Sequence, residues 1–211
     1  MFGARFGMVL ILPADDPAAI ARAADALRAG AVVALPTDTV YGVAAHGFLN
    51  DAVEKIYVIK ERPNEKAIPL LLASADDVRQ VAREVSPAAR RLMARFWPGA
   101  LTLVLKKQPH LPPAVSATDT VAVRVPDHPV VRHLVRALGA PLAATSANKS
   151  GQPELLDAQS IADVLGPRLD LILDGRRCAG GVPSTVVDVS VEPMRVLRVG
   201  AIAVEDLMRA A

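Results

Sequence analysis

The sequence predicts a single α/β domain that contains a mixed β-sheet. Strand-like apolar runs alternate with segments of helical periodicity, and short connections join them. The 211 residues slightly exceed the usual size of one domain, and 52% of them are hydrophobic, so one sizeable core can form. No internal repeat or long linker divides the chain. We therefore expect one domain at residues 8–211, preceded by a flexible tail at residues 1–7.

In the first part of the chain each predicted element has a local signal. A strand at 8–12 leads into a helix that begins near Pro17, whose fixed φ suits a first helical turn, and ends at Gly30. The continuous apolar run 31–35 predicts a strand covered on both faces. Apolar positions three and four residues apart predict a helix at 51–60.

The later elements follow from apolar runs that end at turn residues. A buried strand is expected at 68–73, and Ser74 with Asp77 predicts a capping box for the next helix. Ser86-Pro87 begins another helix, which Pro98-Gly99 ends. The remaining expected strands are 101–105, 121–125, 142–144, 171–174, 185–189 and 196–199, with a helix at 129–138 and a short one near the C-terminus.

Composition and missing motifs exclude several classes of protein. The formal charge of +2 is too small to indicate a nucleic-acid-binding protein by itself. No apolar run approaches the ~20 residues that span a bilayer, so no membrane association is expected. The one cysteine, Cys178, fits a reducing compartment, and we expect a cytoplasmic protein. Its arginine neighbours predict a lowered pKa, but no clear His partner supports a nucleophilic role. The usual phosphate-loop, dinucleotide and zinc motifs are missing, so no built-in metal site is expected.

Polar loops follow or precede several strands and suggest a binding site. The loops are 36–42, 145–151 and 175–183, and they are rich in Ser, Thr, Asn and Gly. Short hydroxyls and backbone N–H groups can bind phosphate or carboxylate oxygens, although ordinary turns use the same residues. In open α/β sheets, ligands tend to bind where loops leave the carboxyl ends of strands.

Cations are placed where they could serve such a site. Lys60, Arg62 and Lys66 form a compact cluster that suits a polyphosphate, or that only complements the dipole at a helix C-terminus. Arg124 interrupts an apolar strand, and burial of its guanidinium requires a partner. That partner is either a protein carboxylate or a substrate carboxylate or phosphate. The same need for a partner applies, more weakly, to Arg198, which lies within the apolar run 196–199.

These motifs together resemble the YrdC family of threonylcarbamoyl-adenylate synthases. The shared pieces follow the family order over nearly the whole chain. They are Pro-Thr-Asp-Thr-Val-Tyr-Gly at 36–42, Lys-x-Arg-Pro at 60–63, Pro-Gly-Ala-Leu-Thr at 98–102, Val-Ala-Val-Arg-Val-Pro at 121–126, Ser-Ala-Asn-x-Ser-Gly at 146–151, Pro-Ser-Thr-Val-Val-Asp at 183–188 and Leu-Arg-x-Gly at 197–200. The chain resembles the short, single-domain form of the family.

The resemblance implies a twisted α/β fold with a basic concave cavity and a nucleotidyltransferase activity. The family forms threonylcarbamoyl-AMP and pyrophosphate from L-threonine, bicarbonate or CO₂, and ATP. Proteins of the tRNA threonylcarbamoyltransferase complex then modify ANN-decoding tRNAs, and the sequence leaves direct tRNA contact open. The implied mechanism is in-line attack of threonine carbamate on the ATP α-phosphorus. Mg²⁺ is expected to arrive with ATP, because no acidic metal cage is evident.

The resemblance also assigns roles to individual residues. Lys60 and Arg62 are expected to be catalytic, and Lys66 is a less secure phosphate contact because relatives vary there. The full expected sets are Arg62, Lys66, Thr120, Ser146, Asn148 and Arg198 for ATP, and Thr39, Arg124 and Ser184 for threonine. Arg124 is expected to hold the threonine carboxylate.

Three other interpretations remain open at this point. A non-catalytic module that binds double-stranded RNA or tRNA would also use a basic concave face, although aromatics make up only 3% of the chain. A second interpretation is the related domain of hydrogenase-maturation carbamoyltransferases, whose acylphosphatase-like and zinc-finger segments do not occur in this sequence. The third is an assembly subunit that keeps the fold without turnover.

Overall fold

The computed structural model describes residues 9–63, 66–178 and 182–211, so the expected tail at 1–7 lies outside the described residues. The described chain forms a ten-stranded sheet in the order β1-β8-β2-β3-β7-β4-β6-β5-β9-β10. The strands are β1 (Leu10–Pro13), β2 (Val33–Leu35), β3 (Gly42–His46), β4 (Leu70–Leu71), β5 (Leu101–Lys106), β6 (Thr120–Arg124), β7 (Leu142–Ser146), β8 (Leu171–Asp174), β9 (Thr185–Asp188) and β10 (Arg195–Arg198). The helices are α1 (Pro17–Arg28), α2 (Asn50–Lys60), α3 (Pro87–Phe96), α4 (Pro129–Leu138), α5 (Ala158–Leu165) and α6 (Val204–Ala210), with 3₁₀ segments η1 (Ala75–Gln80) and η2 (Gly166–Arg168).

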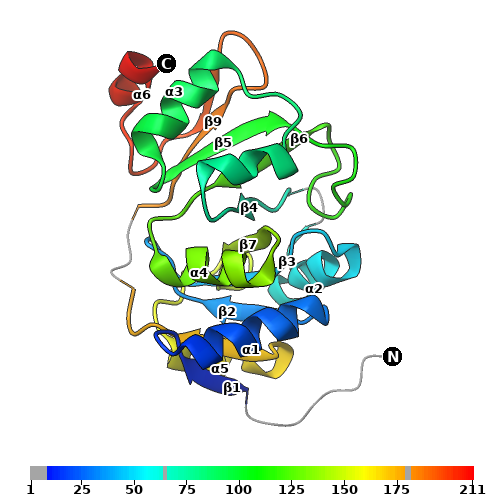
Figure 1. Cartoon of the computed structure of the whole chain (residues 1–211). Coiled ribbons are helices and arrows are strands. Elements are labelled where there is room, and N and C mark those ends of the chain that lie inside the picture. The colour runs from blue at the N-terminus through cyan, green and yellow to red at the C-terminus, as the bar shows by residue number, and fades with distance from the viewer. Residues whose placement is uncertain (1–8, 64–65, 179–181) are drawn as a thin grey trace.

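The sheet is mixed, as the sequence predicts. Strands β1, β8 and β2 run parallel, and so do the pairs β4–β6 and β5–β9. The other neighbouring pairs are antiparallel. Figure 1 shows the long, twisted array, with β1 near one end and β9 near the other.

Helices cover the two faces of the sheet. Successive side chains of β2 point to opposite faces of the sheet. Val33 belongs to a core cluster with residues of α1 and α4, and Ala34 belongs to a second cluster with residues of α2 and α5. Figure 1 shows α1 and α4 side by side over β2 and β7, and α3 beside α6 at the other end of the sheet. Among the described residues, no helix is both long and apolar enough to cross a membrane.

Most predicted elements are confirmed, and the helix at Pro129–Leu138 has the predicted bounds. The expected strand 68–73 is shorter than predicted, because Pro69 cannot donate a backbone hydrogen bond and regular pairing is confined to Leu70–Leu71. The capping box of Ser74 and Asp77 is present, but it begins a 3₁₀ segment.

Two elements were not predicted. β3 contains two alanines and a glycine, which have low strand propensity, yet it pairs with strands on both sides. Helix α5 is capped by Asp157, whose carboxylate accepts a hydrogen bond from the Ser160 backbone N–H at 2.9 Å. Strand pairing therefore establishes β3, and an N-cap residue begins α5, where the periodicity of the sequence had indicated neither element.

Candidate functional site

The loop between β2 and β3 is organised by one hydroxyl group. Thr37 Oγ1 donates to the Val40 carbonyl at 2.6 Å and accepts from the Thr39 backbone N–H at 3.1 Å. It also lies 3.1 Å from Thr39 Oγ1. Thr39 and Asp38 lie in this turn, and both residues are partly buried.

Lys60, at the C-terminus of α2, holds the loop that follows β7. Its side chain is 1% exposed, and its three N–H donors go to the carbonyl oxygens of Ser146 and Asn148 and to Asn148 Oδ1. Ser146 Oγ donates to the same Oδ1 at 2.6 Å. Burial, together with the nearby Arg62 charge, lowers the pKa of Lys60 to about 8. Lys60 thus joins two residues of the expected nucleotide site, and its contact with phosphate stays a prediction.

Arg62 follows α2 and lies over the next segment. Its Nε donates to the Lys66 carbonyl at 3.3 Å and its Nη2 to the Ala67 carbonyl at 3.1 Å. Burial lowers its pKa from the ordinary value, but a guanidinium stays charged at neutral pH. Lys66 itself is exposed, so in this structure only its backbone contacts Arg62.

Arg124 has a protein carboxylate as its partner. Its Nη2 lies 2.6 Å from Asp38 Oδ2, and its Nε donates to the Gly99 carbonyl at 2.9 Å. Both side chains are largely buried, with 9% of Arg124 and 15% of Asp38 exposed. Desolvation lowers the pKa of Arg124, and the Asp38 charge opposes that shift. The first of the two sequence interpretations therefore holds in this structure, and a substrate carboxylate would have to share Arg124 with Asp38.

Arg198 and Ser184 form a second polar cluster close to Arg124. Arg198 donates to the Ser184 carbonyl through Nε at 3.1 Å and through Nη2 at 2.9 Å. Ser184 Oγ lies 2.8 Å from Thr102 Oγ1, and both residues are buried. The positive charge of Arg198 contributes to the lowered pKa of Arg124, so the two guanidinium groups lie near each other. Such a pair of cations suits an anionic ligand.

The 36–42 segment joins these clusters. Asp38 binds Arg124 at one end of the segment, and the Tyr41 carbonyl accepts from the Ala147 backbone N–H at 2.7 Å at the other. Gly42 pairs with Ser146 in the sheet. Thr120 has no side-chain hydrogen bond to these clusters: among the described residues its side chain hydrogen-bonds only to Thr118. Sequence reasoning missed Asp38 and Thr102 as site residues, although both lie inside the quoted motifs.

Cys178 differs from its sequence prediction. Burial raises the pKa of its thiol instead of lowering it, and Sγ donates to the Thr37 carbonyl at 3.4 Å. The neighbouring Arg177 instead contacts Asp157 at 3.1 Å. The thiol therefore contacts the backbone of the 36–42 loop, and the predicted lowering of its pKa is wrong.

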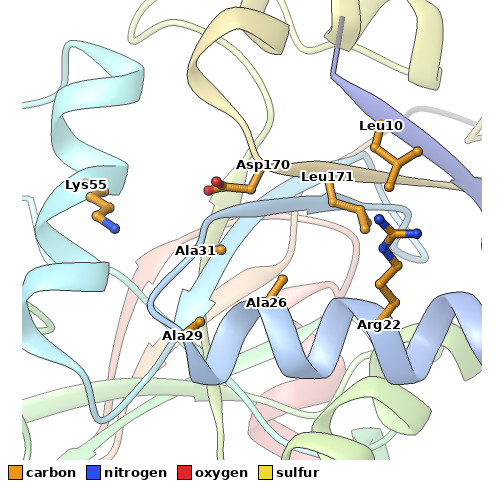
Figure 2. A pocket seen from close by; sticks show the side chains of 8 residues that line it. All are labelled: Leu10, Arg22, Ala26, Ala29, Ala31, Lys55, Asp170 and Leu171. Atoms are coloured by element: carbon orange, nitrogen blue, oxygen red, sulfur yellow. The ribbon is translucent and has the colours of Figure 1, made fainter. Parts of the chain in front are cut away.

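Two surface hollows lie away from all of these residues. Figure 2 shows the first, about 350 Å³, where Lys55, Asp170 and Arg22 face a space beside α1. Lys55 Nζ donates to the Gly30 carbonyl at the end of α1, and Asp170 accepts from the Val32 N–H, so both serve the backbone. The second, about 590 Å³, lies between the start of α3 and the β9–β10 hairpin. Neither contains a predicted site residue, and the basic concave cavity stays a prediction.

The site is cationic and rich in hydroxyl groups. In the part of the chain that the structure describes, no group of three or more His, Cys, Asp or Glu side chains gathers at one point. Arginines, a lysine and hydroxyls can bind phosphate and carboxylate oxygens directly, whereas Mg²⁺ requires oxygen ligands. The arrival of Mg²⁺ with ATP stays a prediction.

Known proteins resemble this chain in sequence and in fold. Residues 25–200 match the Sua5/YciO/YrdC family model, described as "Telomere recombination". The threonylcarbamoyl-AMP synthase of Bacillus subtilis is 42% identical over 93% of this chain, and that of Vibrio cholerae is 38% identical over 85%. The structure of Pyrococcus abyssi Sua5 complexed with L-threonine superposes with a TM-score of 0.91 at 35% identity, over 97% of this chain.

The matches cover these relatives to different extents. The chain spans 57% of the Bacillus protein and 61% of the Pyrococcus structure, but 96% of the Vibrio protein. The family model matches residues 25–200, which is most of the chain. The chain therefore belongs to the Sua5/YciO/YrdC family.

Proposed function

We propose that this chain is a threonylcarbamoyl-AMP synthase. It joins L-threonine, bicarbonate or CO₂, and ATP into threonylcarbamoyl-AMP and releases pyrophosphate. Support comes from the names of its relatives, from the threonine complex of the Pyrococcus protein, and from the joined polar clusters of this chain. The carrying observation is that the 36–42 segment contacts both Arg124 and the loop of Ser146 and Asn148.

The two clusters divide the substrates between them. Arg124, Ser184 and Thr39 form the threonine side, where a guanidinium can bind a carboxylate and short hydroxyls can donate without crowding. Lys60, Arg62, Ser146 and Asn148 form the ATP side, which Lys66 and Thr120 are proposed to complete. Arg198, which donates to the Ser184 carbonyl, is proposed to bind ATP from the border between the two sides. Because Lys60 already uses its donors within the protein, its proposed contribution is to hold Ser146 and Asn148 beside the nucleotide.

Catalysis is proposed to rest on positioning and charge neutralisation. A threonine carbamate is already an anion, so its attack on the ATP α-phosphorus needs no strong general base. Arg62 neutralises charge on the phosphates as pyrophosphate leaves. Mg²⁺, proposed to enter with ATP, supplies further neutralisation of the phosphate oxygens.

The wider setting belongs to the same proposal. The adenylate is passed to proteins of the tRNA threonylcarbamoyltransferase complex, which modify ANN-decoding tRNAs in the cytoplasm. The relatives' names favour this function over the RNA-binding alternative, which would bind RNA in a salt-dependent way and ignore threonine.

Pyrophosphate release tests the proposal directly. The wild-type chain receives ATP, Mg²⁺ and bicarbonate, with and without L-threonine, beside Arg62→Ala and the control Arg90→Ala, an exposed arginine of α3. We expect release that requires both threonine and bicarbonate, that collapses in Arg62→Ala and that persists in Arg90→Ala. Release that ignores threonine would refute the function.

A further inference from the structure

Glu61, the residue between Lys60 and Arg62, has an unusual backbone conformation at the end of α2. Its φ of 52° lies in the left-handed region, which glycine adopts readily and other residues adopt at a cost. Among the described residues other than glycine, only Glu61 and Arg176 have a positive φ. The turn lets the Arg62 N–H donate to the Tyr57 carbonyl at 2.9 Å, and the helix ends there. Glycine would suit this turn better, so the glutamate side chain requires a separate explanation.

The Glu61 carboxylate binds two cations from other parts of the chain. Its Oε1 accepts from Lys149 Nζ at 2.9 Å and from Arg168 Nη1 at 3.0 Å. Arg168 belongs to η2, and the same Nη1 donates to the Ile59 carbonyl of α2 at 3.1 Å. The hydrogen bonds from Lys149 and Arg168 lower the pKa of Glu61, so the carboxylate stays charged at neutral pH. Glu61 therefore joins α2, η2 and the loop that follows β7.

Lys149 lies on the loop that carries the expected nucleotide residues. Asn148 precedes it, and Asn148 Nδ2 donates to the Lys149 carbonyl at 3.1 Å. The Ser150 N–H donates to the Lys60 carbonyl at 2.9 Å, and Lys60 Nζ donates to Asn148 Oδ1 at 3.0 Å. Lys60 thus binds the loop from the interior, whereas Glu61 binds it at the surface, where 54% of the Glu61 side chain is exposed. Two consecutive residues of α2 and its cap therefore fix the loop against the helix.

We propose that Glu61 is a positioning residue, which holds Arg62 and Asn148 at the spacing that ATP requires. This inference rests on the proposed function, in which those two residues bind the nucleotide. Arg62 directly follows Glu61, and Asn148 directly precedes Lys149, so the ion pair joins the neighbours of both nucleotide residues. Exposed ion pairs are weak, and loss of the Glu61 charge is expected to weaken ATP binding by about 2- to 5-fold.

Calorimetric titration with Mg²⁺ and ATP, without threonine or bicarbonate, tests the inference. The chains are wild type, Glu61→Gln, Glu61→Gly and the control Glu54→Gln, an exposed glutamate that hydrogen-bonds Asn50 within α2. We expect both Glu61 variants to bind ATP about 2- to 5-fold more weakly, and the control to bind as wild type does. Urea unfolding should show little change in the stability of Glu61→Gly, because glycine removes the left-handed strain while the ion pairs are lost. A residue that only ends the helix would leave ATP binding intact when replaced by glycine.

A double variant tests the route through Lys149. We expect Lys149→Met to weaken ATP binding, and Glu61→Gln combined with Lys149→Met to bind no more weakly than the weaker single variant. Effects that multiply in the double variant would overturn the link between the two residues. Unchanged or tighter ATP binding in Glu61→Gln would overturn the positioning role, because the carboxylate would then do no more than repel phosphates.

The outcomes separate this inference from the proposed function. Unchanged ATP binding in the Glu61 variants, beside threonine-dependent pyrophosphate release by wild type, overturns the positioning role alone. Wild-type release that ignores threonine overturns the function alone when the Glu61 variants still bind ATP more weakly. A wild-type chain that binds no ATP overturns both.

Discussion

The ion pair between Asp38 and Arg124 is expected to stabilise the fold as well as the site, and a double-mutant cycle can measure it. The two side chains are only 15% and 9% exposed, and the N–O distance is 2.6 Å. Asp38→Ala leaves a buried guanidinium with the Gly99 carbonyl as its remaining partner. Arg124→Met leaves a carboxylate with both oxygens unpaired within the described part of the chain, because Asp38 Oδ1 has no hydrogen-bond partner there.

The size of the effect follows from the burial of the pair. Removal of one partner of a buried ion pair costs about 3–5 kcal/mol, because the other charge stays desolvated. Two charges about 4 Å apart attract by about 4 kcal/mol at an effective dielectric of about 20. We expect each single variant to lower the free energy of unfolding by about 3 kcal/mol, and the double variant to lower it by about 2–4 kcal/mol less than the sum.

Urea unfolding of wild type, the two single variants and the double variant checks this prediction. The four chains must show similar denaturant slopes for the free energies to be compared. A coupling energy below about 0.5 kcal/mol would show that the two residues act independently. Arg124 would then be held mainly by its other contacts, and the argument that Asp38 shares Arg124 with a substrate would fail.

Further outcomes follow from three single residues. Threonine-dependent pyrophosphate release is expected to fall as pH rises through about 8, where Lys60 loses its proton. The free energy of unfolding should instead rise between pH 8 and 10.5, because the lysine of the unfolded chain keeps the proton that Lys60 of the folded chain has released. Urea titrations at several pH values check this, and Lys60→Met should remove the rise. Gly200→Ala should abolish release and destabilise the chain by about 1–3 kcal/mol, because a Cβ would collide with the Pro183 carbonyl oxygen. Thermal unfolding and the pyrophosphate assay check this. Tyr41→Phe should cost about 1–3 kcal/mol in urea unfolding, because its hydroxyl donates to the Arg176 carbonyl at 2.7 Å and accepts from the Gly175 N–H.

Local patterns predicted much of the fold. Helix α4 was predicted with its observed bounds, because Pro129 begins it, Gly139 ends it and its apolar residues repeat at helical spacing. β3 was missed because its alanines carry no strand signal, and only pairing with β2 and β7 makes it a strand. Periodicity is a property of neighbouring residues, and a strand that depends on its partners does not show it.

The candidate site shows the same division. The sequence by itself named the candidate site residues, because the cations and hydroxyl-rich loops stand in short motifs whose composition is visible, and their roles stay predictions. Only the tertiary structure decided how they pair: Lys60 reaches Asn148 across 88 positions, and Arg124 reaches Asp38 across 86. Strand order brings these residues together, and the resulting burial lowers the pKa of Lys60. Among the residues that the structure describes, it also leaves Asp38 Oδ1 without a hydrogen-bond partner. Residue types can be read from each short stretch of the sequence, whereas burial and pairing depend on how the whole chain packs.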